Sequence, residues 1–271
     1  MKFIYCQLLF TFFLISFSGS SQEKDVVPAH DEFTIASKQV GETRNINVWT
    51  PPNYKTSTDS LPVMYMADGG IVEEDFPHIA NTLAALIESK SIPPMILVGI
   101  ANTQRRRDLT GPTAVAKDKE IAPVVGGSVK FRAFIEEELF PAINKRYRTT
   151  NEKSIIGESL SGLFVMETFF LTPEMFDNYI AFDPSLWWNN QYLVKTAKEH
   201  LAKFPTTEKR LWFASSSAKD IRNATKELAE IFKTQDISNL NYHYSPEPKE
   251  QHHTIFRATK EKAIVWTFGN K

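Results

Sequence analysis

Two kinds of apolar pattern alternate along most of the chain. From residue 61 onward, short runs of consecutive apolar residues are typical of buried strands, and the stretches between them have apolar residues every three or four positions, as amphipathic helices do. The expected strands cover residues 61–70, 93–103, 153–159, the first part of 178–188, 209–217 and 240–245. The expected helices cover residues 76–90, 129–147 with a kink or break at Pro141, 160–170, 190–203, 220–234 and 258–268.

A different pattern precedes this alternation. Residues 31–37 and 43–52 alternate between apolar and polar positions and are separated by a short polar turn, which predicts an antiparallel hairpin. Consecutive apolar strands joined by helices predict a mostly parallel sheet with helices on both faces, hence an α/β protein. In such sheets functional residues gather at the carboxyl ends of the strands. Because no repeat or low-complexity linker divides residues 21–271, we expect a single domain there.

The N-terminus has the pattern of a secretory signal peptide. Lys2 precedes an apolar run of residues 3–17, and the small residues Ser18-Gly19-Ser20 follow it. We therefore expect residues 1–20 to be removed on export, with an uncleaved anchor as the alternative. Cys6, the only cysteine, lies in this segment, so the mature chain would have no disulfide. A secreted or periplasmic location fits this expectation.

The overall charge argues against some partners. The net charge is −1, and Lys and Arg are scattered rather than clustered. We therefore expect no nucleic-acid partner and no membrane insertion after signal cleavage. No group of His, Asp or Glu has metal-ligand spacing and no glycine-rich phosphate loop occurs, so no metal or cofactor is expected. The oligomeric state remains open.

Candidate chemistry begins at residues 157–162, Gly-Glu-Ser-Leu-Ser-Gly, between an expected strand and an expected helix. A nucleophilic serine on a sharp strand-to-helix turn needs small residues two positions before and after it. Ser159 meets this requirement, with Gly157 before it and Ser161 after it, although glycine is usual at the latter position. Ser161 has Leu163 two positions later, and Ser154 fails on both sides. The alternative is an ordinary turn with Ser159 as a helix cap.

Such a serine needs a base and an acid later in the chain. His252 and His253 lie in the polar loop before the last helix, where this type of enzyme places its base, whereas His200 and His243 lie within expected elements. Asp220, after the strand at 209–217, is the favoured acid. Its position fits equally well a structural role, in which its negative charge stabilises the N-terminus of the following helix. Asp183 is the second candidate.

Two backbone N–H groups are expected to stabilise the oxyanion of an acyl-transfer intermediate. Leu160, the residue after the nucleophile, supplies one of them by the geometry of the turn. The other is expected after the strand at 61–70, where two glycines let the backbone approach a substrate. Gly70 is the preferred donor and Gly69 the alternate.

Taken together, these residues resemble the putative esterase family of α/β-hydrolases, which includes siderophore, feruloyl and acetylxylan esterases. The resemblance covers about residues 33–268, through the strand ending in Asp68-Gly69, the Asn-Thr and Arg-Asp loop at 102–112, and Phe-Asp-Pro-Ser-Leu-Trp-Trp at 182–188. Asp183 replaces the usual serine of that last segment. The resemblance implies the α/β-hydrolase fold, with Ser159 as nucleophile and His252, two residues after Glu250, as base. It leaves open whether Asp220, Asp183 or no acid completes the triad, since some siderophore esterases resemble enzymes with only a Ser–His dyad.

The resemblance also suggests substrate-binding residues. Trp187, Trp188 and Arg107 are candidates, because the siderophore-esterase branch has the Arg-Asp loop and the Trp pair most plainly. Adjacent tryptophans are also common in protein cores, and Arg107 beside Asp108 favours a structural ion pair over substrate recognition.

The combined expectation is a secreted serine esterase that forms an acyl-enzyme on a small-molecule ester, with a siderophore-type or aromatic ester first. A feruloyl or acetyl-xylan esterase and an acyltransferase are the enzymatic alternatives. A hydrolase-fold binding protein that has lost its chemistry is the alternative from another class.

Overall fold

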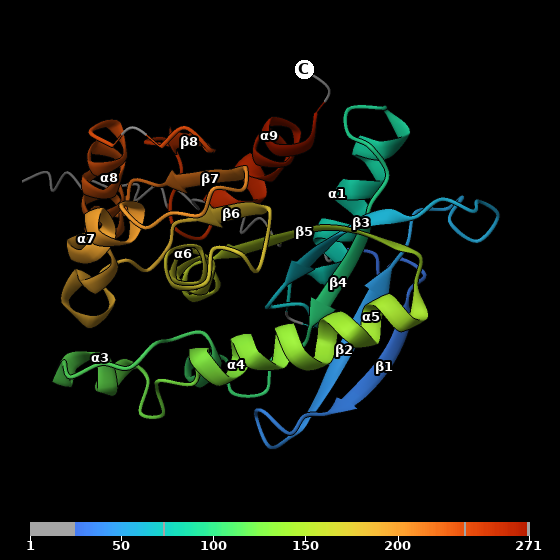
Figure 1. Ribbon diagram of the computed structural model, residues 1–271, viewed down its shortest axis with the longest axis horizontal. Helices are drawn as coiled ribbons and strands as arrows, with labels where there is room; N and C mark the ends of the chain where they lie inside the picture. The colour runs from blue at the N-terminus through green and yellow to red at the C-terminus, as the bar shows by residue number, and fades with distance from the viewer. Residues whose placement is uncertain (1–24, 73, 236, 270–271) are drawn as a thin grey trace, which may run out of the picture.

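One sheet organises the described part of the protein. Figure 1 shows the computed structural model, which describes residues 25–72, 74–235 and 237–269. Its strands are β1 Asp31–Ala36, β2 Thr43–Trp49, β3 Leu61–Met66, β4 Ile96–Ile100, β5 Thr149–Glu158, β6 Asn178–Phe182, β7 Lys209–Ser215 and β8 Leu240–Pro246. Within the described ranges they form an eight-stranded sheet in the order β1-β2-β4-β3-β5-β6-β7-β8.

The strand directions confirm the expected antiparallel hairpin followed by a parallel sheet. β2 pairs antiparallel with both β1 and β4, whereas every neighbouring pair from β4 to β8 is parallel. Met66 of β3 is opposite Ile156 of β5, and Glu158 of β5 is opposite Phe182 of β6. The carboxyl ends of β3, β5 and β6 therefore lie next to one another at one edge of the sheet, and the loops that follow these strands meet there.

Helices cover both faces, so alternate residues of each strand point into different cores. Ile180 and Phe182 of β6 pack with α1 Phe76–Glu88 and α9 Ile255–Phe268, which lie side by side at the upper right of Figure 1. Tyr179 and Ala181 pack on the opposite face. The other helices are α2 Arg105–Asp108, α3 Ala116–Ile121, α4 Ser128–Phe134, η1 Ile135–Leu139, α5 Phe140–Arg146, α6 Leu160–Leu171, α7 Trp188–Leu201 and α8 Lys219–Lys233. Burial on both faces explains why the strands have consecutive apolar residues.

The helix expected at 129–147 does not break at Pro141. It continues from α4 through the π-helical turn η1 into α5, and Pro141 lies in the first turn of α5. A proline lacks an N–H and its ring crowds the carbonyl four residues earlier, which here belongs to Glu137. That residue lies within the wider π-turn, which accommodates the ring.

Two further segments differ from the expectation. Residues 102–128, expected to be loop, contain the short helices α2 and α3. The beginning of α7 is irregular because Asn189, Asn190 and Gln191 have left-handed φ angles between 48° and 61°. The described residues contain no helix that is both long and apolar enough to cross a membrane. The expected signal peptide, residues 1–20, lies outside the described residues.

Candidate active site

Ser159 lies on a strained turn between β5 and α6. Its φ of 59° and ψ of −117° are unusual for a residue with a side chain. The turn is held by its backbone: the Ser159 N–H donates to Phe182 O at 3.0 Å, and the Ser159 carbonyl accepts from Leu163 N at 2.8 Å and Ser185 N at 3.1 Å. This backbone conformation is the one expected of a nucleophile that projects from the edge of the sheet.

The small residues around Ser159 are required by close contacts. A Cβ on Gly157 would lie 2.3 Å from Ser161 Oγ, and one on Gly162 would lie 2.8 Å from Phe182 O. Ser161 is only 2% exposed, and its Oγ accepts a 3.1 Å hydrogen bond from the Glu158 N–H. The serine that replaces the usual glycine thus stabilises the turn rather than competing with Ser159.

Ser159, His252 and Asp183 form a continuous hydrogen-bonded chain. His252 Nε2 lies 3.1 Å from Ser159 Oγ, and His252 Nδ1 lies 2.9 Å from Asp183 Oδ2. An ionised carboxylate can only accept hydrogen bonds, so Nδ1 carries the hydrogen and donates it to Asp183. In the neutral imidazole Nε2 is then free to accept a proton from the Ser159 hydroxyl, which is the arrangement of a catalytic triad.

The structure corrects the acid predicted from the sequence: Asp183 contacts His252, and Asp220 does not. Asp220 is an exposed residue in the first turn of α8, where its charge lies near the positive end of the helix. Asp183 follows β6, the strand beside β5, and its side chain is fully buried. Its left-handed φ of 41° is one that aspartate tolerates better than most residues.

Asp183 is held in position by the residue that follows β7. Ser216 donates to it from both its backbone N–H and its hydroxyl, each at 2.5 Å. These two donors and the His252 ring satisfy a carboxylate that would otherwise be costly to bury. Ser216 was not singled out from the sequence, since its role depends on the pairing of β6 with β7.

His252 is oriented by its own loop and by Asp183. The Glu250 carbonyl accepts from the Ser217 N–H at 2.9 Å, and the Glu250 carboxylate accepts from Thr254 Oγ1 at 2.7 Å. His253 is exposed and does not share the contacts of His252. The hydrogen bond to Asp183 raises the pKa of His252 above its ordinary value, although partial burial opposes the shift.

Glu158, the residue before the nucleophile, adds an unusual carboxyl group. Burial raises its pKa to about 8, with further increases from the charges of Asp75, Asp183 and Asp68 and a decrease from His252. At neutral pH Glu158 is therefore mostly uncharged. Its ionisation at higher pH would favour the protonated form of His252.

The two proposed glycine donors differ in their partners. The Gly69 N–H donates to Ile100 O at 3.0 Å, which rules out Gly69 as a free donor. The Gly70 N–H donates to the Glu74 carboxylate at 2.7 Å. Leu160 begins α6, and among the described residues no acceptor is recorded for its N–H. Leu160 thus offers a free donor, whereas the donor at Gly70 is occupied.

The tryptophan pair is divided between core and surface. Trp188 is 4% exposed, and its Nε1–H donates to Gly111 O at 3.0 Å. It lines a cavity of about 290 Å³ together with Leu163, one helical turn from Ser159. Trp187 is only partly buried and packs against Trp188 with ring centroids 5.9 Å apart. The structure thus makes Trp188 mainly a core residue and leaves Trp187 as the more accessible candidate.

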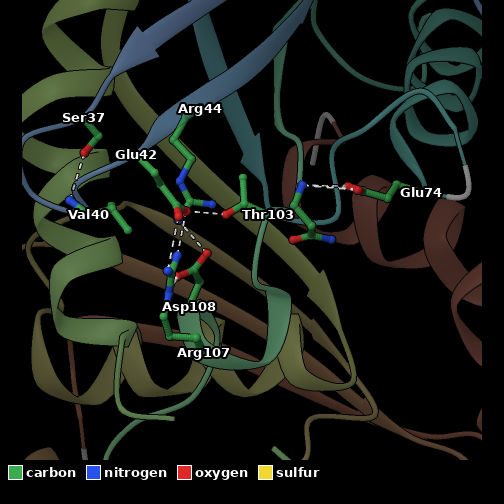
Figure 2. A network of polar contacts seen from close by, with 9 residues as sticks. Ser37, Val40, Glu42, Arg44, Glu74, Thr103, Arg107 and Asp108 are labelled. Carbon is green, nitrogen blue, oxygen red and sulfur yellow. Dashed lines mark hydrogen bonds and ion pairs between the residues drawn. The ribbon is translucent and has the colours of Figure 1, made fainter. Parts of the chain in front are cut away.

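Arg107, also predicted to bind substrate, is engaged in a structural network. Figure 2 shows Glu42, Arg44, Arg107 and Asp108 pointing toward one another. Arg107 Nη2 donates to Glu42 at 2.7 Å and Arg107 Nε donates to Asp108 at 2.7 Å. Arg44, only 1% exposed, donates to Asp108 at 2.6 Å. These contacts lower the pKa of Glu42 to about 2, mainly through Arg107, and occupy the Arg107 guanidinium.

Arg105, on the same short helix, was not selected from the sequence, although it lies nearer the site. It donates to both oxygens of Asp68, at 2.5 Å from Nε and 2.8 Å from Nη2. Asn102 Nδ2 also donates to Asp68, at 2.6 Å. Asp68 begins the turn that leads to Gly70 and has a left-handed φ of 56°. The two side chains therefore fix the start of this turn.

Metal chemistry has no candidate ligand set in this part of the chain. Within residues 25–72, 74–235 and 237–269, no three His, Cys, Asp or Glu side chains are grouped so that they could hold a metal ion.

Comparison with known proteins identifies the family. A family profile described as "Putative esterase" matches residues 37–265, most of the chain. The chain belongs to this family. Among solved structures, an IroE-like serine hydrolase from Shewanella oneidensis is 26% identical, with a TM-score of 0.78 over 88% of this chain and 79% of that one. The likeness confirms the predicted α/β-hydrolase fold.

Two curated relatives are similar in sequence. The ferri-bacillibactin esterase BesA of Bacillus subtilis is 29% identical over 66% of this chain and 66% of its own length. The siderophore triacetylfusarinine C esterase of Aspergillus fumigatus is 30% identical over 64% of this chain and 61% of its own length. The matches thus span just under two thirds of each relative.

Proposed function

We propose that this protein is a serine hydrolase that cleaves carboxylic esters through an acyl-enzyme. The observation that carries the proposal is the chain of hydrogen bonds from Ser159 through His252 to Asp183, at the edge of the sheet where the loops after β5 and β6 meet. Membership of the esterase family supports the same reaction class. A binding protein that had lost its chemistry would have no need to keep this geometry together.

In the first half of the reaction, His252 Nε2 takes the proton of the Ser159 hydroxyl as Oγ attacks the ester carbonyl. The Leu160 N–H, with that of Gly70, stabilises the negative charge that develops on the carbonyl oxygen. The tetrahedral intermediate collapses, the carbon–oxygen bond to the alcohol breaks, and protonated His252 gives its proton to the departing alcohol oxygen. Asp183 keeps the imidazole oriented and stabilises its positive charge.

In the second half, a water molecule attacks the acyl-enzyme. His252 accepts the water proton, a second tetrahedral intermediate forms, and its collapse returns the proton to Ser159 Oγ and releases the carboxylic acid. The reaction needs no electron transfer and no co-reactant besides water.

For the substrate, we propose a siderophore-type or other bulky aromatic ester. The names of the two relatives, one a ferri-bacillibactin esterase and the other a triacetylfusarinine C esterase, support the siderophore class. The partly exposed Trp187 supports an aromatic group beside the site. A panel of a catecholate trilactone, methyl ferulate, acetylated xylan and p-nitrophenyl esters tests the substrate class. Cleavage of short acetyl esters alone would contradict it.

The direct test of the reaction class compares two serines of the same turn. Ser159→Ala should lower kcat/KM on a p-nitrophenyl ester by on the order of 10³-fold or more, because the nucleophile is lost. Ser161→Gly should retain activity, since it restores the usual residue of the turn. The reverse pattern would show that Ser159 is not the nucleophile.

We also propose that the protein is exported, with residues 1–20 as its signal peptide. Lys2, the apolar run and the small residues after it support this proposal. N-terminal sequencing of the protein recovered from the periplasm or medium tests it: a mature chain that begins near residue 21 is expected, and an intact Met1 in the cytoplasm would contradict it.

A further inference from the structure

The second oxyanion donor lies beside the nucleophile. β3 and β5 are neighbouring parallel strands in which Met66 is opposite Ile156. Gly70 lies four residues beyond Met66, and Ser159 lies three residues beyond Ile156, so both turns occupy the same edge of the sheet. The interaction between the charges of Asp68 and Glu158 also indicates that the two turns are close. The Gly70 N–H is therefore well placed to complement that of Leu160.

That N–H is already bound. Its acceptor is Glu74 Oε2, at 2.7 Å, and the Asn102 N–H donates to Glu74 Oε1 at 3.2 Å. Figure 2 shows the Glu74 carboxylate with its hydrogen bond to a backbone nitrogen drawn as a dashed line. A Cβ on Gly70 would lie only 2.8 Å from the Glu74 carboxyl carbon, so the two residues are in close contact. An anionic oxygen thus accepts the hydrogen bond that a substrate oxyanion would need.

The turn does not depend on Glu74 for its shape. The Asp75 N–H donates to Asp68 O at 3.0 Å, and the Gly69 N–H donates to Ile100 O at 3.0 Å. Arg105 and Asn102 hold the Asp68 side chain. Asp68, Gly69 and Asp75 are therefore held by contacts that would remain if the Glu74 carboxylate were removed.

The Glu74 carboxylate is also held at a cost. Burial raises its pKa, and the nearby charge of Asp68 adds to the increase. The hydrogen bonds from Gly70 and Asn102 and the charge of Arg105 lower the pKa but do not cancel the increase. A partly desolvated carboxylate can be displaced more readily than a well-solvated or fully paired one, because its release to water recovers solvation.

We propose that Glu74 is an internal competitor for the oxyanion donor, and that its carboxylate must leave the Gly70 N–H before the tetrahedral intermediate can form. The inference rests on the proposed esterase function and adds a residue that limits the rate of the same reaction. Binding of the ester carbonyl oxygen displaces the Glu74 oxygen, and no covalent bond to Glu74 forms or breaks.

The experiment compares two acidic residues of one segment. Glu74→Ala removes the acceptor of the Gly70 N–H and leaves this donor free for the substrate. The value of kcat/KM on a p-nitrophenyl ester should therefore rise about tenfold, which corresponds to about 1.4 kcal/mol in the barrier. Glu74→Gln keeps the shape but removes the charge, and it should give a smaller increase. Asp75→Asn also removes one carboxylate, but Asp75 contacts Arg257 and not Gly70, so its kcat/KM should stay within about twofold of the parent.

A second measurement reports on the donor directly. Phenylboronic acid forms a tetrahedral adduct with a reactive serine and places an anionic oxygen where the oxyanion lies. Its inhibition constant should fall about tenfold in Glu74→Ala and remain unchanged in Asp75→Asn. If both Glu74 variants left the inhibition constant and kcat/KM unchanged, or worsened both, Glu74 would not be a competitor. Thermal melting identifies a misfolded Glu74→Ala, in which case Glu74→Gln decides.

Ser159→Ala separates this inference from the proposed function. If Ser159→Ala kept its activity, the esterase proposal itself would fail. If Ser159→Ala were inactive while both Glu74 variants behaved like the parent, only the competitor role of Glu74 would be wrong.

Discussion

The two halves of the candidate site differ in how ready they are for catalysis. The proton-transfer half is assembled: Ser159, His252 and Asp183 are joined by hydrogen bonds of 3.1 and 2.9 Å, and Asp183 is fully buried. The charge-stabilising half is only partly available, since Glu74 occupies the Gly70 N–H. A nucleophile and its base can therefore be preorganised while one N–H donor of the oxyanion site is still bound to a side chain of the protein.

The largest expected effect removes the base from the assembled half. His252→Ala should lose activity about as completely as Ser159→Ala, on the order of 10⁴-fold in kcat, because the members of a triad act together. His253→Gly, its neighbour and control, should keep at least about a tenth of the activity, since His253 is exposed. Steady-state kinetics of both variants on one p-nitrophenyl ester makes the comparison, and an inactive His253→Gly beside an active His252→Ala would overturn it.

A smaller loss should follow from changing the acid. Asp183→Asn should lower kcat by on the order of 10³-fold, because the amide favours the wrong imidazole tautomer and cannot stabilise its charge. Asp220→Asn, at the acid first favoured from the sequence, should stay within about threefold, because Asp220 is an exposed helix residue. Equal losses in kcat for the two variants would contradict the placement of Asp183 as the partner of His252.

The smallest expected effect concerns pH. Activity needs neutral His252, so kcat/KM should rise with pH through a pKa above the ordinary value, since the folded protein raises it. This differs from the ordinary value of about 6.5 that an unperturbed histidine would give. Glu158→Gln should leave this rise unchanged around neutral pH, because the Glu158 carboxyl group is mostly uncharged there. A rise that moves to lower pH in this variant would show that Glu158 is already ionised where His252 titrates.

Much of the fold could be predicted because its signals are local. The consecutive apolar residues of β6, for example, follow directly from burial on both faces of the sheet. The path of the chain through Pro141 could not be predicted in the same way. Whether a proline ends a helix or is accommodated depends on the width of the preceding turn, which packing decides.

The residues of the candidate site also differ in whether their signal is local in the sequence. Ser159 could be predicted from the small residues around it, and His252 from its loop and the family resemblance. In both cases the signal comes from residues close by in the sequence. The choice between Asp183 and Asp220 depended instead on which strand lies beside β5, on a left-handed residue and on two donors from Ser216. Glu74 was missed for a similar reason, since only the folded turn brings its carboxylate to Gly70.

The central claim is that Ser159 is a nucleophile activated by His252. The most direct measurement is peptide mass spectrometry after treatment with a fluorophosphonate, which bonds to an activated serine oxygen as fluoride leaves. We predict one adduct, on Ser159. In His252→Ala the labelling of Ser159 should be slower by at least about 10³-fold. An adduct on Ser161, or labelling of Ser159 at the same rate without His252, would contradict the claim.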